Sequence, residues 1–170
     1  MGNSSHEPYR DALEAIGTTS DAEIDLAESA LLLASIDRPD EPLEPYRVHL
    51  AELAHAATTA TRNSDSVRVQ ADARRTTLAD EFGYRGDSET YDDMRNANLL
   101  SVIDRRRGLP VALGILYIHA ARGYGADVVG LNFPSHFVVR IEARGQRLVI
   151  DPFDEFGCRG STPPFERPSR

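Results

Sequence analysis

The chain has 170 residues, 41% of them hydrophobic, and a formal net charge of −8 from 27 acidic residues and 19 arginines, without a lysine. This length and hydrophobic content suit one domain with a buried core, and the acidic balance argues against nucleic acid as a partner, because nucleic-acid binding usually needs a basic face. The single cysteine excludes an internal disulfide, and the lack of lysine excludes a lysine Schiff base.

Three helices are expected in the first half of the chain, because apolar residues recur there at helical spacing: residues 21–36, 45–61 and 66–81. Ser20 and Asp21 are the expected caps of the first helix, and the two prolines after residue 38 end it. No set of reactive side chains in the three helices suggests a chemical site. They are therefore interpreted as a helical leader subdomain over residues 1–82.

The character of the sequence changes at Gly83, where a loop rich in acidic residues begins. A short helix is expected over residues 98–106, and Gly108 is expected to stop it. Pro110 suits the first position of the next helix, because its missing N–H costs nothing there. The dense apolar content of residues 110–122 is typical of a central, buried helix.

Strands are expected after this helix, because β-branched and aromatic residues dominate three short segments: residues 127–131, 136–142 and 147–151. A turn at residues 144–146 would join the last two as an antiparallel hairpin. The predicted fold class is therefore α+β, with a central buried helix against a small antiparallel sheet over residues 83–157. Residues 158–170 are expected to form a flexible C-terminal tail.

The predicted hairpin carries the two residues that point most directly to chemistry. His136 opens its first strand and Asp151 closes its second, so an antiparallel pairing can bring the two side chains together. A carboxylate beside an imidazole fixes its tautomer and raises its basicity, which is the base and orienting acid of a nucleophilic triad. The alternative is a buried structural pair, since charged groups persist in a core only when they are paired.

Four motifs follow one another between residues 84 and 157: YDDMRN at 91–96, GLPVAL at 108–113, GLNFPSHFVVR at 130–140 and IDPF at 150–153. Each is weak alone, but the ordered set resembles the transglutaminase-like superfamily, and more closely its SirB1 N-terminal-like ("core 2") family. The helical leader is also similar to the leader of that family. The resemblance implies a papain- or transglutaminase-like core preceded by a helical subdomain.

Active members of this superfamily use Cys, His and Asp for acyl transfer or hydrolysis, and His136 and Asp151 match the last two by position. The position of the nucleophile holds the apolar run Leu-Pro-Val-Ala at 109–112, and no Cys, Ser or Thr occurs from 109 to 114. The resemblance implies that this cysteine is commonly missing from the family and that its activity is not established. Ser135 stands where the family usually has glycine before the histidine.

Seven residues are predicted to line the cleft around His136: Asn96, Pro110, Val111, Ala112, Asn132, Ser135 and Phe153. Asn96 has a second interpretation as a helix cap, and Tyr91 either lines the cleft or only packs. Cys158 lies in a glycine-rich segment that could fold back toward His136 as a substitute nucleophile. A lone cysteine is more often an inert small residue, so this role is the weaker interpretation.

The sequence therefore predicts a transglutaminase-like domain that has lost its thiol and binds a protein, a peptide or a small molecule. The alternative is a hydrolase or acyltransferase that uses a His136–Asp151 dyad, and a third reading is a purely structural interaction module. No cofactor or metal is expected, since no ligand set assembles in the sequence. No nucleic-acid or membrane partner is expected either, and the polar N-terminus and short apolar stretches favour a soluble, cytoplasmic protein.

Overall fold

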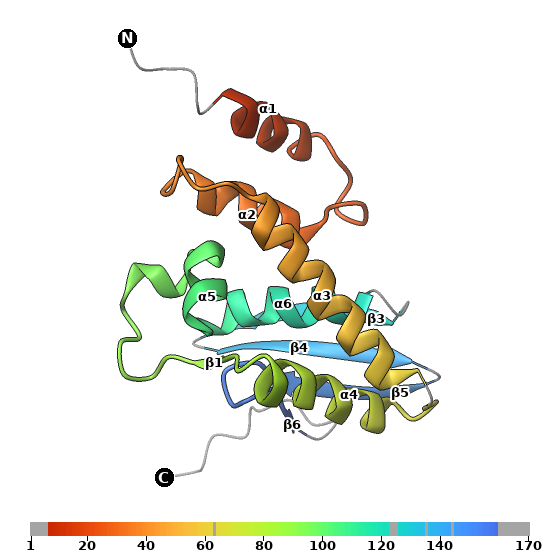
Figure 1. The fold of residues 1–170 in the computed structure, drawn as a ribbon. Coiled ribbons are helices and arrows are strands. Elements are labelled where there is room, and N and C mark those ends of the chain that lie inside the picture. The colour runs from red at the N-terminus through yellow and green to blue at the C-terminus, as the bar shows by residue number, and fades with distance from the viewer. Residues whose placement is uncertain (1–6, 63, 123–125, 135, 144, 160–170) are drawn as a thin grey trace.

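Helix α6 (Pro110–Arg122) lies at the centre of the computed structural model, which describes residues 7–62, 64–122, 126–134, 136–143 and 145–159. Figure 1 shows α6 lying along the sheet, with α3 passing diagonally over it and α1 set apart beyond α2. The elements before α6 are α1 (Glu7–Ile16), α2 (Leu26–Ser35), α3 (Glu44–Thr61), α4 (Val67–Arg75), a π-helical turn η1 (Thr76–Glu81), β1 (Arg85–Gly86), a 3-10 turn η2 (Met94–Asn96), α5 (Leu99–Arg105) and β2 (Arg107–Gly108).

The strands after α6 form one antiparallel sheet in sequential order: β3 (Asp127–Phe133), β4 (His136–Ala143), β5 (Gln146–Asp151) and β6 (Gly157–Arg159). Helix α6 packs against β3 and β4, and α4 packs against β5 and β6. The short strands β1 and β2 pair in parallel beside them. The predicted α+β class, with a central helix on a small antiparallel sheet, is confirmed.

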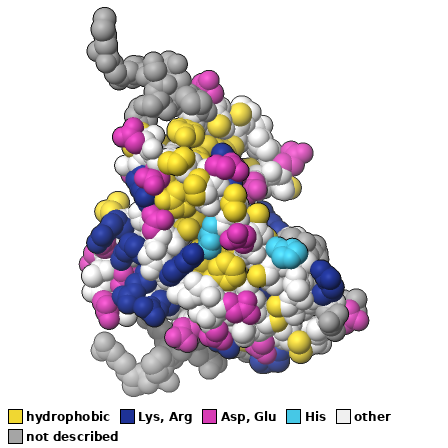
Figure 2. Space-filling model, in the orientation of Figure 1, with side chains coloured by type: hydrophobic (Ala, Val, Ile, Leu, Met, Phe, Trp, Pro, Cys, Tyr) yellow, Lys and Arg dark blue, Asp and Glu magenta, His cyan; other side chains and the backbone are white. Residues whose placement is uncertain are grey.

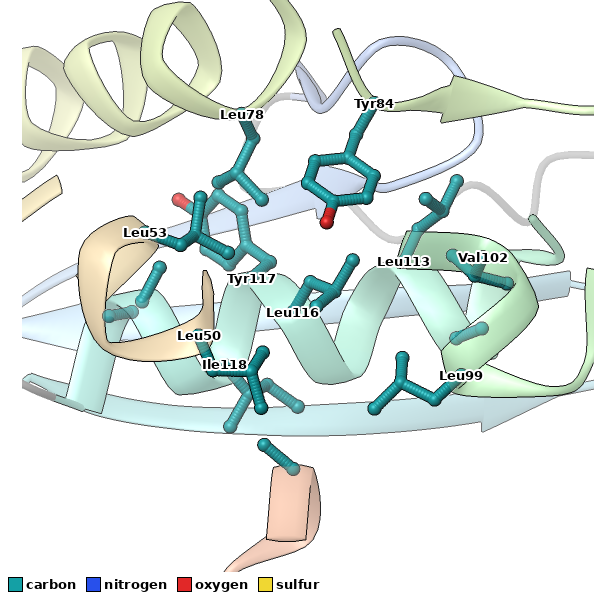
Figure 3. Packing of buried hydrophobic residues seen from close by; sticks show 14 of the residues in the cluster. Leu50, Leu53, Leu78, Tyr84, Leu99, Val102, Leu113, Leu116, Tyr117 and Ile118 are labelled. Carbon is teal, nitrogen blue, oxygen red and sulfur yellow. The ribbon is translucent and has the colours of Figure 1, made fainter. Parts of the chain in front are cut away.

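The core is built around α6, because eight of its thirteen residues are buried. Figure 3 shows Leu113, Leu116 and Tyr117 of α6 surrounded by leucines of α3 and by Leu78 and Tyr84. One hydrophobic cluster contains buried residues from α2 through to the last strands, so leader helices and sheet share a core. The division into subdomains at residue 82 stays a prediction.

The start of the first long helix differs from its prediction. Helix α2 begins at Leu26, because the carboxylate of Asp25 accepts hydrogen bonds from the N–H groups of Ala27 and Glu28 at 3.0 and 3.1 Å. Ser20 instead donates to the carboxylate of Glu23 at 2.6 Å within a separate turn. Helix α1, which precedes that turn, is not predicted from the sequence at all.

The other boundaries follow the sequence with several differences, among them the short strands β1 and β2, which were not predicted. The predicted third helix changes to π-helical hydrogen bonding at Thr76. Helix α5 ends at Arg105 and not at Gly108, because Arg106 caps it with a left-handed backbone of φ 58°. The hairpin turn is shorter than expected, since Ala143 pairs with Gln146. Strand β6 is also unexpected, and the rest of the predicted tail, residues 160–170, lies outside the described residues.

His49 of α3, which contacts Tyr84 and Arg106, predicts how the stability of the fold changes with pH. Burial, and then the charge of Arg106, lower the pKa of His49 from 6.5 to about 4. The unfolded chain therefore binds a proton more readily than the folded chain between these two values, and stability falls as the pH falls through this window.

His49→Gln is accordingly expected to flatten the pH dependence of unfolding. Because His49 is only half-buried, we expect wild type to lose about 1–2 kcal/mol more than the variant between about pH 7 and about pH 4. Urea denaturation at several pH values measures the difference. His55→Gln, at an exposed position on the same helix, should keep the wild-type slope, and equal slopes for all three proteins would contradict the prediction.

Candidate functional site

A pocket of about 440 Å³ lies over the start of α6, where β3 ends and β4 begins. The loop that precedes α5 contributes one wall. The residues that line the pocket are Tyr91, Leu109, Pro110, Val111, Asn132, Phe133, His136 and Phe137. The pocket therefore joins three segments that are far apart in the sequence, at residues 91, 109–111 and 132–137.

His136 and Asp151 meet beside this pocket. Val139 pairs with Ile150, so the next step in register places Asp151 opposite Val138, two residues after His136 and on the same face. Nε2 of His136 lies 3.1 Å from Oδ2 of Asp151, with side chains 33% and 2% exposed. The imidazole can thus face the pocket while the carboxylate stays buried behind it.

The close contact between the two side chains is not an aligned hydrogen bond. Within the part of the chain that the structure describes, Nε2 of His136 has no hydrogen-bond partner of ordinary geometry, although Oδ2 of Asp151 is close. The other carboxylate oxygen, Oδ1, accepts from the N–H groups of Phe153 and Asp154 at 3.0 and 3.3 Å. These backbone contacts hold Asp151 in place beside the imidazole.

The entry of α6 supplies an apolar wall instead of a nucleophile. The N–H of Leu113 donates to the carbonyl of Leu109 at 3.1 Å, so Pro110 is the first residue of the helix and Val111 the second. Val111 is 45% exposed and faces the pocket, whereas Ala112 is buried. Among the described residues that line the pocket, none has a thiol or an aliphatic hydroxyl.

The ring of Phe137 fixes the distance between α6 and the sheet beside the pocket. It occupies a notch between Gly114 of α6 and Gly130 of β3, and a Cβ atom added at either glycine would overlap the ring. A side chain at these two positions would push the helix and strand apart. The two glycines thus set the position of the strand start that carries His136.

The predicted cleft residues divide into three groups. Pro110, Val111 and Asn132 line the pocket as expected. Ala112 and Asn96 do not line it, because both are buried in the fold. Phe153 does not line the pocket either, although its ring centroid lies 5.8 Å from that of Tyr91, and Ser135 lies outside the described residues. The lining residues that were not predicted are Leu109, Phe133 and Phe137.

Asn96 instead belongs to a buried network that holds the loop carrying Tyr91. Its side chain donates to the carbonyl of Thr90 at 2.6 Å and accepts from Arg105 at 2.9 Å. Arg105 also contacts the buried carboxylate of Asp87 at 3.0 Å. The hydroxyl and N–H of Thr90, followed by Arg105 and Asn96, hold the pKa of Asp87 well below its ordinary value. The network keeps a charged carboxylate under the loop and so positions Tyr91 at the pocket.

Cys158 does not approach His136. Cys158 lies in β6, an outer strand of the sheet, where it pairs with Ile150 of β5. Its Sγ lies 3.6 Å from Oδ1 of Asp72 on α4. Burial, and then the charge of Asp72, raise the pKa of the thiol, which disfavours the reactive thiolate. The position of Cys158 therefore argues against its suggested role as a substitute nucleophile.

Neither a metal-binding cluster nor a membrane-spanning helix occurs among the described residues. No cluster of three or more His, Cys, Asp or Glu side chains lies close enough to hold a metal ion there. In the same part of the chain, every helix is too short or too polar to cross a membrane.

Comparisons with known proteins agree with the predicted fold class. The profile of the transglutaminase-like superfamily matches residues 44–157, and the chain belongs to this superfamily. The narrower resemblance to the SirB1 N-terminal-like family stays a prediction. No solved structure gives a significant match.

The chain is similar to bacterial proteins named UPF0162. It is 32% identical to one from Vibrio cholerae over 132 residues, which cover 77% of this chain and 49% of the relative. It is 30% identical to one from Xylella fastidiosa over 140 residues, which cover 82% of this chain and 50% of the relative. A shorter match to human F-box only protein 21 has 32% identity over 83 residues, which cover 49% of this chain and 13% of that protein. The chain thus spans about half the length of its bacterial relatives.

Proposed function

We propose that the pocket over the start of α6 binds an extended peptide segment and that the domain is a binding module without thiol chemistry. The observation that carries the proposal is the entry of α6, where Leu109, Pro110 and Val111 form an apolar wall of an open pocket. An acyl-transfer enzyme of this fold needs a nucleophile at that place. An apolar wall suits side-chain binding instead.

The rim of the pocket supports binding of a peptide. Tyr91 and Val111 are 51% and 45% exposed, so two large apolar side chains stand at one opening. Exposed apolar groups around a concave surface favour binding of another molecule, because their burial releases ordered water. Asn132 adds an amide that can pair with a peptide backbone.

The edge of the sheet supports an extended conformation of that peptide. Strand β3 is the outer strand of the sheet, and its last residues, Asn132 and Phe133, line the pocket. Within the described residues its outer edge pairs with no other strand, which leaves backbone donors and acceptors available. A peptide could add to β3 as a further strand and place its end in the pocket.

A peptide array tests the proposal. Wild type should capture a defined set of immobilised peptides. Val111→Trp should capture them about 10-fold more weakly or worse, because the indole fills the pocket. Val69→Trp is the matched control, since Val69 is similarly exposed but lies on α4, and it should keep the wild-type set. Capture unaffected by Val111→Trp, or no capture by wild type, would reject the proposal.

The 3.1 Å contact between His136 and Asp151 favours one alternative, a hydrolase in which the imidazole activates water. Release of 4-nitrophenolate from 4-nitrophenyl acetate measures this activity. If the alternative holds, His136→Ala removes the release above background and His55→Ala, at an exposed histidine, does not. Equal release by the two variants would exclude it.

A further inference from the structure

A second pocket, separate from the one at His136, lies between the start of α3 and the end of α5. Its volume is about 360 Å³, and its lining residues are Glu41, Pro42, Pro45, Tyr46, His49, Ile103, Asp104 and Arg106. None of these residues lines the pocket at His136. The wall contains groups of both charges.

Arg106 is the positive group of this pocket, and its surroundings are neutral. Its Nη1 donates to the hydroxyl of Tyr84 at 2.5 Å and contacts Nε2 of His49 at 2.6 Å. Its guanidinium also lies over the Tyr84 ring, 4.9 Å from the centroid. Burial lowers the pKa of His49 to about 4, so this imidazole is uncharged at neutral pH.

The charge of Arg106 has no counter-ion in the described part of the chain. Most other arginines with partners contact a carboxylate, as Arg105 does with Asp87 and Arg107 with Glu89. No carboxylate of a described residue lies within ion-pair distance of Arg106, even though acidic residues outnumber basic ones in this protein and Figure 2 shows acidic side chains spread over the visible face. A half-buried cation without a carboxylate partner is suited to bind an external anion.

The backbone at Arg106 adds an independent observation. The residue caps α5 in the left-handed region, with φ 58° and ψ 24°, where glycine is the usual residue because it has no Cβ. A long side chain at this place costs conformational energy that a glycine would not. The strained backbone aims a guanidinium at His49 and Tyr84, and strain of this kind is concentrated at functional sites.

The two carboxylates of the pocket, Glu41 and Asp104, together carry more negative charge than their shared arginine neutralises. Arg38 is shared by two carboxylates: its Nη1 lies 2.7 Å from Oδ2 of Asp104, and its Nη2 lies 3.4 Å from Oε2 of Glu41. One positive charge therefore faces two negative charges, which leaves one negative charge uncompensated. The same pocket thus presents one unpaired positive and one unpaired negative charge.

We propose that this pocket binds a small zwitterion of the α-amino acid class. The carboxylate of the ligand would pair with Arg106, and its ammonium would pair with Glu41 and Asp104. A simple anion would meet repulsion from the two carboxylates, and a simple cation would meet repulsion from Arg106. Only a ligand that carries both charges can pair with Arg106 and with the two carboxylates at the same time.

Titration of the full chain with each standard free amino acid, followed by 1H–15N NMR, tests this proposal. At least one amino acid should shift the signals of His49 and Arg106 saturably. The N-acetylated and the amidated forms of the same amino acid each lack one charge, and both should bind about 10-fold more weakly or worse. No saturable shift with any amino acid, or equal binding of either blocked form, would overturn the proposal.

Two variants separate binding from folding. Arg106→Gly removes the guanidinium and also relieves the left-handed backbone, so the chain should fold and lose amino acid binding. Glu41→Gln, at a partly exposed side chain, should weaken binding of the free amino acid but not of its N-acetylated form. Arg62→Gln, at an exposed arginine beyond the far end of α3, should bind as wild type does. Unchanged binding by Arg106→Gly would overturn the assignment.

Discussion

Val111→Cys, made in a Cys158→Ala background, is expected to react with iodoacetamide at about pH 6.5 some 10-fold or more faster than an ordinary exposed thiol. The new thiol would stand at the second residue of α6, in the pocket that His136 also lines. The helix N-terminus and a protonated imidazole both favour the thiolate. Alkylation rates measured over a range of pH should therefore show a lowered thiol pKa.

Two comparisons decide whether the imidazole is responsible. Val111→Cys combined with His136→Ala should lose most of the rate gain, and Val111→Cys combined with Asp151→Asn should lose part of it. Val69→Cys, exposed on α4, gives the reference rate of a thiol without a partner. If the rate of Val111→Cys does not depend on His136, the His136–Asp151 pair is structural only, and the hydrolase alternative loses its support.

Gly114→Ala is expected to destabilise the protein by about 1–3 kcal/mol, although alanine is normally the better helix residue by about 1 kcal/mol. The reason is the ring of Phe137, which an added Cβ at Gly114 would overlap. Because α6 is buried on most sides, it cannot shift without disturbing its other contacts. Urea denaturation of wild type and variant measures the change in the free energy of unfolding.

A double-mutant cycle identifies the cause. Phe137→Leu alone should destabilise the protein by leaving a cavity, but it also makes room for a Cβ at position 114. Gly114→Ala should therefore cost much less, or stabilise, in the Phe137→Leu background. Equal costs of Gly114→Ala in both backgrounds would show that the Phe137 ring does not set the distance between helix and sheet.

The local sequence was sufficient for the elements that carry the dyad. Pro110 marks the first residue of α6, and the β-branched run after His136 marks β4. The register of a hairpin is also fixed locally, because a short turn allows few ways of pairing the two strands. The proximity of His136 to Asp151 could therefore be predicted. The absence of Cys, Ser and Thr from residues 109–114 was likewise evident from the sequence.

The lining of the pocket could not be predicted in the same way. Tyr91 reaches it because a network around Asp87 holds its loop, and Phe137 reaches it because two glycines from α6 and β3 leave a notch. Each arrangement joins residues that are distant in the sequence, so it depends on how helices pack on the sheet. Periodicity and capping signals contain no information about such contacts.

The same distinction separates what the sequence determined from what only the tertiary structure decided. Length, patterning and motif order determined the α+β class, the central helix and the His136–Asp151 hairpin. The folded chain alone decided that Cys158 faces Asp72 and that Arg106 has only neutral partners beside the carboxylates of a second pocket. The physical reason is that local structure follows from backbone preferences over a few residues, whereas a site follows from which side chains share a buried space after packing.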